Sequence, residues 1–193
     1  MTFFKALVTG IFLALVGLSY AKADEPYWLL IDTSAQSLMV MEGKTVKRRF
    51  SNIAVGRNGT SPVHQRGDNT TPLGGFRIAW VNRNSRYKTF FGFDYPNLPL
   101  AEKALQQGLI DPLTYDEITT AIRRGQLPPQ NTPLGGHLGI HGLGRADPDI
   151  HATMNWTQGC VALTNQQIDE LAKWVEVGTR VVISEGNVAA LTE

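Results

Sequence analysis

Residues 136–165 read GHLGIHGLGRADPDIHATMNWTQGCVALTN, and this stretch decides how the sequence is interpreted. A short apolar run ends at His141 and Gly142, and Gly159 then precedes Cys160 shortly before a segment with helical spacing. Cys160 is the single cysteine of the chain. A lone cysteine is either a small buried apolar residue or a reactive thiol. Gly159 leaves the sulfur approachable and the neighbouring N–H groups free to stabilise an oxyanion, which favours the reactive thiol.

A nucleophilic cysteine needs a base close in space, because only the thiolate attacks efficiently and a free thiol has a pKa of about 8.5. The chain offers four histidines. His141 is the best candidate, because it ends an apolar strand where strand meets loop. His137 and His151 are predicted to be bystanders or supporting residues. His64 lies in a polar loop at 57–69 and is predicted to be solvated.

A zinc site is the alternative use of these residues, because His137 and His141 are four residues apart and His151 and Cys160 are available as further ligands. Glycines at 136, 139 and 142 disfavour a helix here. Along a strand, residues four apart lie about 13 Å from each other. One zinc ion therefore cannot bind both histidines, and the sequence predicts no metal and no other cofactor.

The first residues predict export. Lys5 is followed by an apolar run at 6–18 and a small-x-small cleavage site at 21–23, which together predict a signal peptide over 1–23. The apolar run is shorter than the roughly 20 residues that cross a bilayer, so no membrane span is expected after cleavage. Without Lys5 and Lys22 the formal net charge changes from +1 to −1, which argues against nucleic acid as a partner. The periplasm or cell wall is the expected location.

Residues 24–193 are predicted to form one mostly β domain of the α+β class. The spacing of apolar residues and turns predicts strands at 27–32, 37–41, 46–55, 76–81, 138–142 and 180–183, and helices at 101–105, 114–122 and 165–177. Thr114 and Glu117 predict a capping box for the second helix, and Thr164 or Asn165 is expected to cap the third. Prolines bound a helical insertion at 96–133 that is expected to be able to cover a binding cleft.

The run Ile140-His141-Gly142, followed by TQGCV at 157–161, resembles the active-site signature of the L,D-transpeptidase catalytic domain family, also described as YkuD-like. A strand, turn and strand at 29–40, a Thr-Pro-x-Gly turn at 71–74 and a closing helix and strand at 166–183 agree with this resemblance, which covers essentially all of 24–193. The resemblance implies a β-sandwich with a mixed sheet, a helical insertion and a helix after the nucleophile.

The resemblance also implies a reaction. Cys160 would attack the carbonyl that joins the third residue of a peptidoglycan tetrapeptide stem, usually diaminopimelate, to D-alanine. His141 would deprotonate the thiol and later protonate the leaving amine, while the backbone carbonyl of Gly142 holds the imidazole. Gly159 and Cys160 would supply the oxyanion donors. The acyl group would pass to an amine of a second stem or of an outer-membrane lipoprotein, or to water.

Two positions depart from the family pattern. Gln158 stands where many members have histidine, and a glutamine donates a hydrogen bond but cannot titrate. Ala162 stands where members often have asparagine or arginine, so Arg145 or Arg77 is the candidate for binding a substrate carboxylate. Surface solvation is the alternative for both arginines.

The residues next to the nucleophile are the candidates for further substrate contacts, namely Trp156, Thr157 and Gln158. Aromatic side chains at Phe90, Phe91, Phe93 and Tyr95 either line a groove together with Trp156 or pack the core.

Three functions remain open for the chain: acyl transfer, hydrolysis as a carboxypeptidase or amidase in the same fold, and a non-catalytic wall-binding module. The presence of both Cys160 and His141 disfavours the binding module. The first two functions differ in whether an amine or water reaches the acyl-enzyme, and an insertion that closes over the acceptor side would favour water. A thiolate of this kind is expected to react with carbapenem-type β-lactams.

Overall fold

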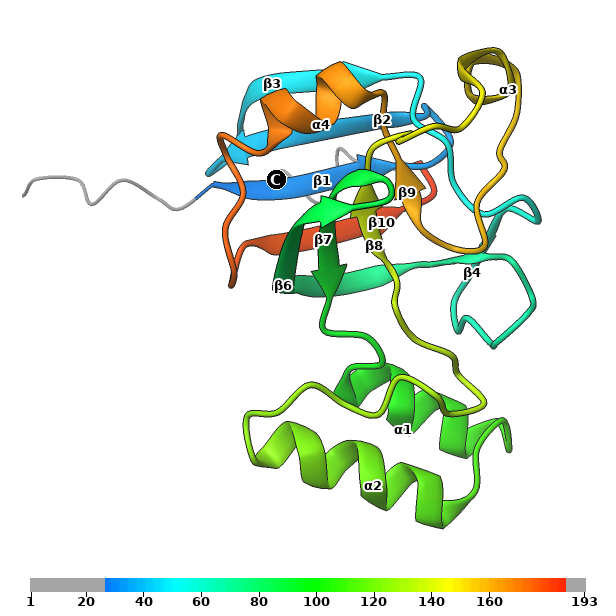
Figure 1. Ribbon diagram of the computed structural model, residues 1–193. Helices are drawn as coiled ribbons and strands as arrows, with labels where there is room; N and C mark the ends of the chain where they lie inside the picture. The colour runs from blue at the N-terminus through cyan, green and yellow to red at the C-terminus, as the bar shows by residue number, and fades with distance from the viewer. Residues whose placement is uncertain (1–26, 187–193) are drawn as a thin grey trace, which may run out of the picture.

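The computed structural model describes residues 27–186, and the predicted signal peptide at 1–23 lies outside the described residues. Eight strands form one mixed sheet in the order β3-β2-β1-β10-β6-β7-β8-β9 (Figure 1). These strands are β1 (Trp28–Asp32), β2 (Ser37–Glu42), β3 (Thr45–Ser51), β6 (Gly74–Ser85), β7 (Lys88–Phe93), β8 (Gly139–His141), β9 (Val161–Ala162) and β10 (Arg180–Ser184). A two-stranded parallel sheet holds β4 (Thr60–Ser61) and β5 (Thr71–Pro72).

Strand β6 connects the two layers of the large sheet. Its residues 74–77 pair with β10, and its remainder from Ile78 pairs with β7. Side chains from both layers meet in one hydrophobic core, among them Leu29, Ile31, Phe91, Ile140, Val181 and Ile183. Parallel pairs, β1 with β10 and β8 with β9, occur beside antiparallel ones. The predicted mostly β fold with a mixed sheet is therefore confirmed.

The two ends of the sheet are joined beside the segment that carries the cysteine. Ala54, which follows β3, donates its N–H to the Ala162 carbonyl at 3.0 Å and accepts from the Ala162 N–H at 2.8 Å. Further along, the N–H of Thr157 donates to Val55, and that of Arg57 donates to Thr157. The chain after β3 therefore runs alongside residues 157–162 and fixes their position.

The helices are α1 (Leu98–Gln106), α2 (Pro112–Arg123), α3 (Pro148–Thr153) and α4 (Asn165–Leu171). The predicted capping box at Thr114 is wrong, because α2 begins at Pro112 and its N-cap is Asp111, whose carboxylate accepts from the Thr114 N–H at 2.7 Å. An aspartate followed by proline is a strong helix start, since proline lacks the N–H that would be unpaired there.

The helix after the cysteine begins as expected but ends early. Thr164 is its N-cap, in a capping box with Gln167. Helix α4 ends at Leu171 rather than 177, and the chain continues through tighter bonds three residues apart, such as Trp174 N–H to the Leu171 carbonyl at 2.9 Å. No helix within residues 27–186 is long and apolar enough to cross a bilayer.

The predicted insertion is a helical hairpin of α1 and α2 at the end of the sheet remote from α3 (Figure 1). Its apolar side chains Ala101, Ala104 and Ile118 are buried and extend the core. The chain leaves the sheet after β7 and returns at the neighbouring β8. The Gln130 side chain joins the start and the end of this insertion through two hydrogen bonds, here called the clasp. It donates to the Tyr95 carbonyl and accepts from the His137 N–H, both at 2.7 Å.

Candidate active site

The turn before β9 sets the position of Cys160. The Thr157 hydroxyl accepts from the Gly159 N–H at 3.1 Å and donates to the Cys160 carbonyl at 2.7 Å. Gly159 has a φ of +127°, which side chains rarely tolerate. A Cβ at this position would lie 2.7 Å from the Thr70 carbonyl oxygen. Glycine is therefore required here both by the turn and by the loop that packs against it.

Removing the Thr157 hydroxyl is expected to loosen this turn. Thr157 is 3% exposed, so Thr157→Val keeps its shape but leaves the Gly159 N–H unpaired. An unpaired buried polar group costs about 1–3 kcal/mol of unfolding free energy. Denaturant unfolding measures this loss, and Thr157→Ser is the control that keeps the hydroxyl. Equal midpoints for the valine and serine variants would show that the hydroxyl does not shape the turn.

His141 is held in the tautomer that a general base requires. Its Nδ1 lies 2.7 Å from the Gly142 carbonyl oxygen, so Nδ1 carries the proton and Nε2 keeps a lone pair. The imidazole is 2% exposed and stacks on Tyr87 with ring centroids 4.3 Å apart. The edge of Trp156 completes the enclosure at 5.9 Å. The Gly142 carbonyl is therefore at hydrogen-bonding distance from the imidazole, at the atom that the family resemblance implied.

The strand register places His141 and Cys160 on one face of the sheet. In the parallel pair of β8 and β9, Ile140 is opposite Val161 and His141 is opposite Ala162. Cys160 lies two residues before Ala162, and side chains two residues apart point to the same face of a strand. His141 and Cys160 are therefore diagonal neighbours, and both line one cleft of about 900 Å³.

Burial keeps both groups uncharged at rest. Burial raises the pKa of Cys160 to about 12, although a backbone hydrogen bond with Gly139 lowers it in part. Burial likewise lowers the pKa of His141 to about 4, which the hydrogen bond to Gly142 opposes and the charge of Arg86 reinforces. The thiol points to the His137 carbonyl at 3.6 Å, as a neutral donor does. The resting site is a neutral thiol beside a neutral imidazole.

The His141 ring is therefore expected to stay neutral down to about pH 4. An imidazole in water takes up its proton near pH 6.5, whereas a depressed pKa moves protonation to lower pH. Nuclear magnetic resonance of ring-labelled histidine between pH 3.5 and 8 measures the midpoint, and His141→Gln assigns the resonance. A midpoint near 6.5 would contradict the enclosure of the ring.

The structure brings most of the predicted site residues together. Trp156, Thr157 and Gln158 line the cleft with the cysteine and histidine, although the Thr157 hydroxyl is used within the turn. Arg145 lies in a neighbouring depression with Leu143 and Ala146, outside the cleft lining. Arg77 lies on β6 and donates to the Gly178 carbonyl, also outside the cleft.

Several residues of the cleft were not singled out from the sequence. These residues include Arg57, Arg66, Arg86, Gln130 and Asn131. The cleft is also lined by His64, which was predicted to be solvated, and by His137, which was predicted to be a bystander or supporting residue. The insertion at 96–133 was expected to be able to cover the cleft. Of its residues, Gln130 and Asn131 line the cleft, whereas helices α1 and α2 contribute none to the lining. Among the aromatic candidates, Phe90 and Trp156 line the cleft, whereas Phe91, Phe93 and Tyr95 pack the core.

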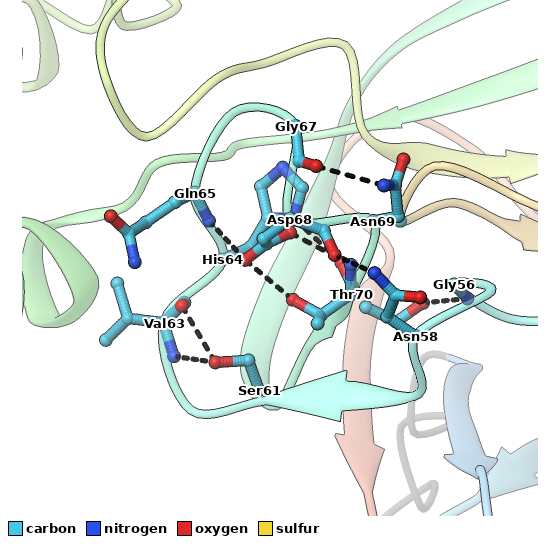
Figure 2. A network of polar contacts seen from close by, with 12 residues as sticks. Gly56, Asn58, Ser61, Val63, His64, Gln65, Gly67, Asp68, Asn69 and Thr70 are labelled. Atoms are coloured by element: carbon cyan, nitrogen blue, oxygen red, sulfur yellow. Dashed lines mark hydrogen bonds and ion pairs between the residues drawn. The ribbon is translucent and has the colours of Figure 1, made fainter.

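The prediction that His64 is solvated is wrong. His64 is 3% exposed, and its Nδ1 lies 2.8 Å from an Asp68 carboxylate oxygen and 2.7 Å from the Thr70 carbonyl oxygen (Figure 2). The His64 ring packs against the turn at 157–160, since a Cβ on Gly159 would lie 3.1 Å from His64 Cε1. The burial comes from tertiary folding of the loop onto this turn, which local polarity does not reveal. The spacing of four residues between His64 and Asp68 was the sequence signal from which this contact could have been predicted.

Within residues 27–186, no group of three or more histidine, cysteine, aspartate or glutamate side chains is arranged to hold a metal ion. The site instead joins a thiol, a histidine with a free Nε2, and the Cys160 backbone N–H at a glycine turn, whereas the Gly159 N–H, also predicted to be an oxyanion donor, is bonded to the Thr157 hydroxyl. Groups of these kinds can perform cysteine acyl transfer, and here they are placed on a β-sandwich. Residues 26–183 match the L,D-transpeptidase catalytic domain family, and the chain belongs to this family.

Solved structures of low sequence identity share the fold. The helical cell shape determining protein Pgp2 of Campylobacter jejuni is 21% identical with a TM-score of 0.55, and the match covers 85% of this chain and 49% of Pgp2. Bd1075 of Bdellovibrio bacteriovorus is 18% identical with a TM-score of 0.53, covering 86% and 50%. This chain thus spans about half the length of these two proteins. No curated protein matches the chain.

Proposed function

We propose that the chain is an exported cysteine acyltransferase that acts on peptidoglycan stem peptides as an L,D-transpeptidase in the periplasm or cell wall. The observation that carries this proposal is the buried His141, with Nδ1 bonded to Gly142, beside Cys160 in one cleft. Membership of the family supports the substrate class.

In the first step, His141 Nε2 takes the thiol proton as Cys160 Sγ attacks the carbonyl between the third residue and D-alanine. Because both groups are neutral at rest, charge develops only during the reaction, inside the cleft. The oxyanion needs a donor, and the Gly159 N–H is already bonded to Thr157, so we assign this role to the Cys160 N–H. The carbon–nitrogen bond then breaks, and the imidazolium gives its proton to the leaving D-alanine.

In the second step, an amine attacks the thioester, His141 accepts the proton of the amine, and the thiol is restored. The amine belongs to a second stem or to an outer-membrane lipoprotein. Helices α1 and α2 contribute no residue to the cleft lining. This supports transfer to an amine, since an insertion that closed over the acceptor side would favour water.

Product analysis tests the proposal. The protein is incubated with purified disaccharide-tetrapeptide, and the products are followed by mass spectrometry, with protein alkylated on its thiol as the control. A dimer that has lost one D-alanine is the expected product. A tripeptide alone would instead establish a carboxypeptidase, and release of a partner from a crosslinked substrate, tested in a parallel incubation, would establish an amidase. Identical products from native and alkylated protein would contradict thiol chemistry and leave a binding module.

A further inference from the structure

The cleft carries only positive charge. Its lining includes three arginines and three histidines and no aspartate or glutamate, although acidic and basic residues are almost balanced over the whole chain. The charged residues of the lining are the arginines Arg57, Arg66 and Arg86, which stand beside the histidines His64, His137 and His141. A concave site with charge of one sign favours a ligand of the opposite sign.

A braced loop forms one wall of this cleft. The Asp68 carboxylate accepts from the backbone N–H groups of Gln65 and Thr70 at 2.7 and 2.9 Å, and from the Thr70 hydroxyl at 2.9 Å (Figure 2). It also holds His64 Nδ1. Asn58 adds a bond to the Asp68 carbonyl. The acidic group is therefore used within the loop, and the loop has a fixed conformation.

Two of the cleft arginines, Arg57 and Arg66, lie in or next to this loop. Arg57 is anchored by its N–H on the Thr157 carbonyl at 2.9 Å, and its guanidinium donates to the Asn69 side chain at 3.1 Å. Arg66 is anchored by its N–H on the Pro133 carbonyl at 2.9 Å. In the part of the chain that the structure describes, neither arginine forms an ion pair.

The third arginine of the cleft, Arg86, contacts an aromatic side chain that packs against His141. The Arg86 guanidinium lies 4.7 Å from the centre of the Tyr87 ring and donates to the Tyr87 hydroxyl at 2.9 Å. Tyr87 in turn stacks on His141. Arg57 and Arg66 are thus the cations of the cleft with room for an incoming anion.

We infer that Arg57 and Arg66 form an anion subsite that binds a carboxylate of the donor stem. This inference rests on the proposed function. The stem offers two carboxylates near the bond that is cleaved, one at the end of D-alanine and one on the side chain of diaminopimelate. The planar fork of arginine matches a carboxylate with two parallel hydrogen bonds. Ala162 cannot serve this purpose, because it is fully buried in β9.

Amidated substrates test the subsite. Three tetrapeptide donors are compared: the free acid, the C-terminal carboxamide and the diaminopimelate side-chain carboxamide. For the wild type, one of the two amides is expected to lower kcat/KM for release of the terminal residue by about tenfold to a hundredfold. In Arg57→Gln or Arg66→Gln, the free acid becomes slower and this penalty shrinks to about twofold or less. Arg66→Lys keeps the charge but not the fork, and is expected to restore part of the penalty.

Arg124→Gln is the matched control, because this exposed arginine caps the far end of α2 and does not line the cleft. Its amide penalty should equal that of the wild type. Equal rates of the wild type on all three donors, or a full penalty in both glutamine variants, would overturn the subsite.

Failure of the proposed function has a different signature, namely no release from any donor by the wild type. In that case calorimetry with Cys160→Ala decides the matter. Tighter binding of the free acid than of an amide, lost in the Cys160→Ala/Arg66→Gln protein, would still support the subsite. Equal binding of all three peptides would reject it.

Discussion

Replacing Cys160 by alanine is expected to lower kcat for D-alanine release by about 10⁵-fold or more, to the rate without protein. Among the described residues that line the cleft with His141, Cys160 carries the only thiol, and removal of the nucleophile from a comparable catalytic unit costs about 10⁶-fold. Release of D-alanine from purified disaccharide-tetrapeptide measures the loss.

The variant is expected to fold normally, because Cys160 is partly exposed and its sulfur has one long hydrogen bond, to the His137 carbonyl. Circular dichroism and thermal unfolding check this. Intact-mass analysis with a carbapenem gives a readout independent of the natural substrate, since the wild type should gain one adduct and Cys160→Ala none. Stem cleavage by the folded variant at more than a few per cent of the wild-type rate would exclude Cys160 as the nucleophile.

Replacing His141 by glutamine is expected to lower kcat/KM by about 10⁴-fold at neutral pH, the upper end of what general acid–base catalysis contributes. The amide cannot accept the thiol proton, and burial raises the pKa of the thiol to about 12. The variant must therefore rely on spontaneous ionisation, so its remaining rate should rise about tenfold per pH unit between pH 7 and 10. The wild type should stay flat over this range, because its base is already neutral.

The double variant separates a catalytic pair from two independent residues. Because the cysteine and histidine act as one unit, Cys160→Ala/His141→Gln should be no slower than Cys160→Ala alone. A flat pH profile for His141→Gln would contradict the role of His141, since it would show that the thiol loses its proton by another route.

Local sequence patterns predicted the parts of the site that lie within one segment. The glycine turn at Cys160, the strand end at His141 and the cap at Thr164 each rest on neighbouring residues, and the structure has the elements there. Strands β1, β2, β3, β6, β8 and β10 were found for the same reason, because alternation of apolar residues reports on burial directly, whereas β4, β5, β7 and β9 were not predicted. Short helix α3 and the cap at Asp111 were missed, since polar runs that contain proline also fit turns.

Features that depend on distant segments were not predictable in this way. His64 and Asp68 are in a polar loop, and only its packing against Gly159 buries the imidazole. Arg145 follows His141 closely in sequence, yet it lies in a different depression. The cations that do reach the cleft come from residues 57 and 66, far from the cysteine along the chain. Proximity in sequence was a poor guide to which arginine faces the nucleophile.

The clasp at Gln130 has a consequence for how this domain can be altered. The helical hairpin leaves and re-enters the sheet through two strands that pair with each other, and Gln130 ties its exit to Tyr95. Doubling the length of such a loop costs only about 0.6 kcal/mol of closure entropy. The exposed turn at 107–108, between α1 and α2, is therefore a natural graft point, because the helices themselves contribute to the core. A foreign wall-targeting or reporter module inserted there would be carried by the domain, while the pairing of β7 with β8 keeps His141 in position.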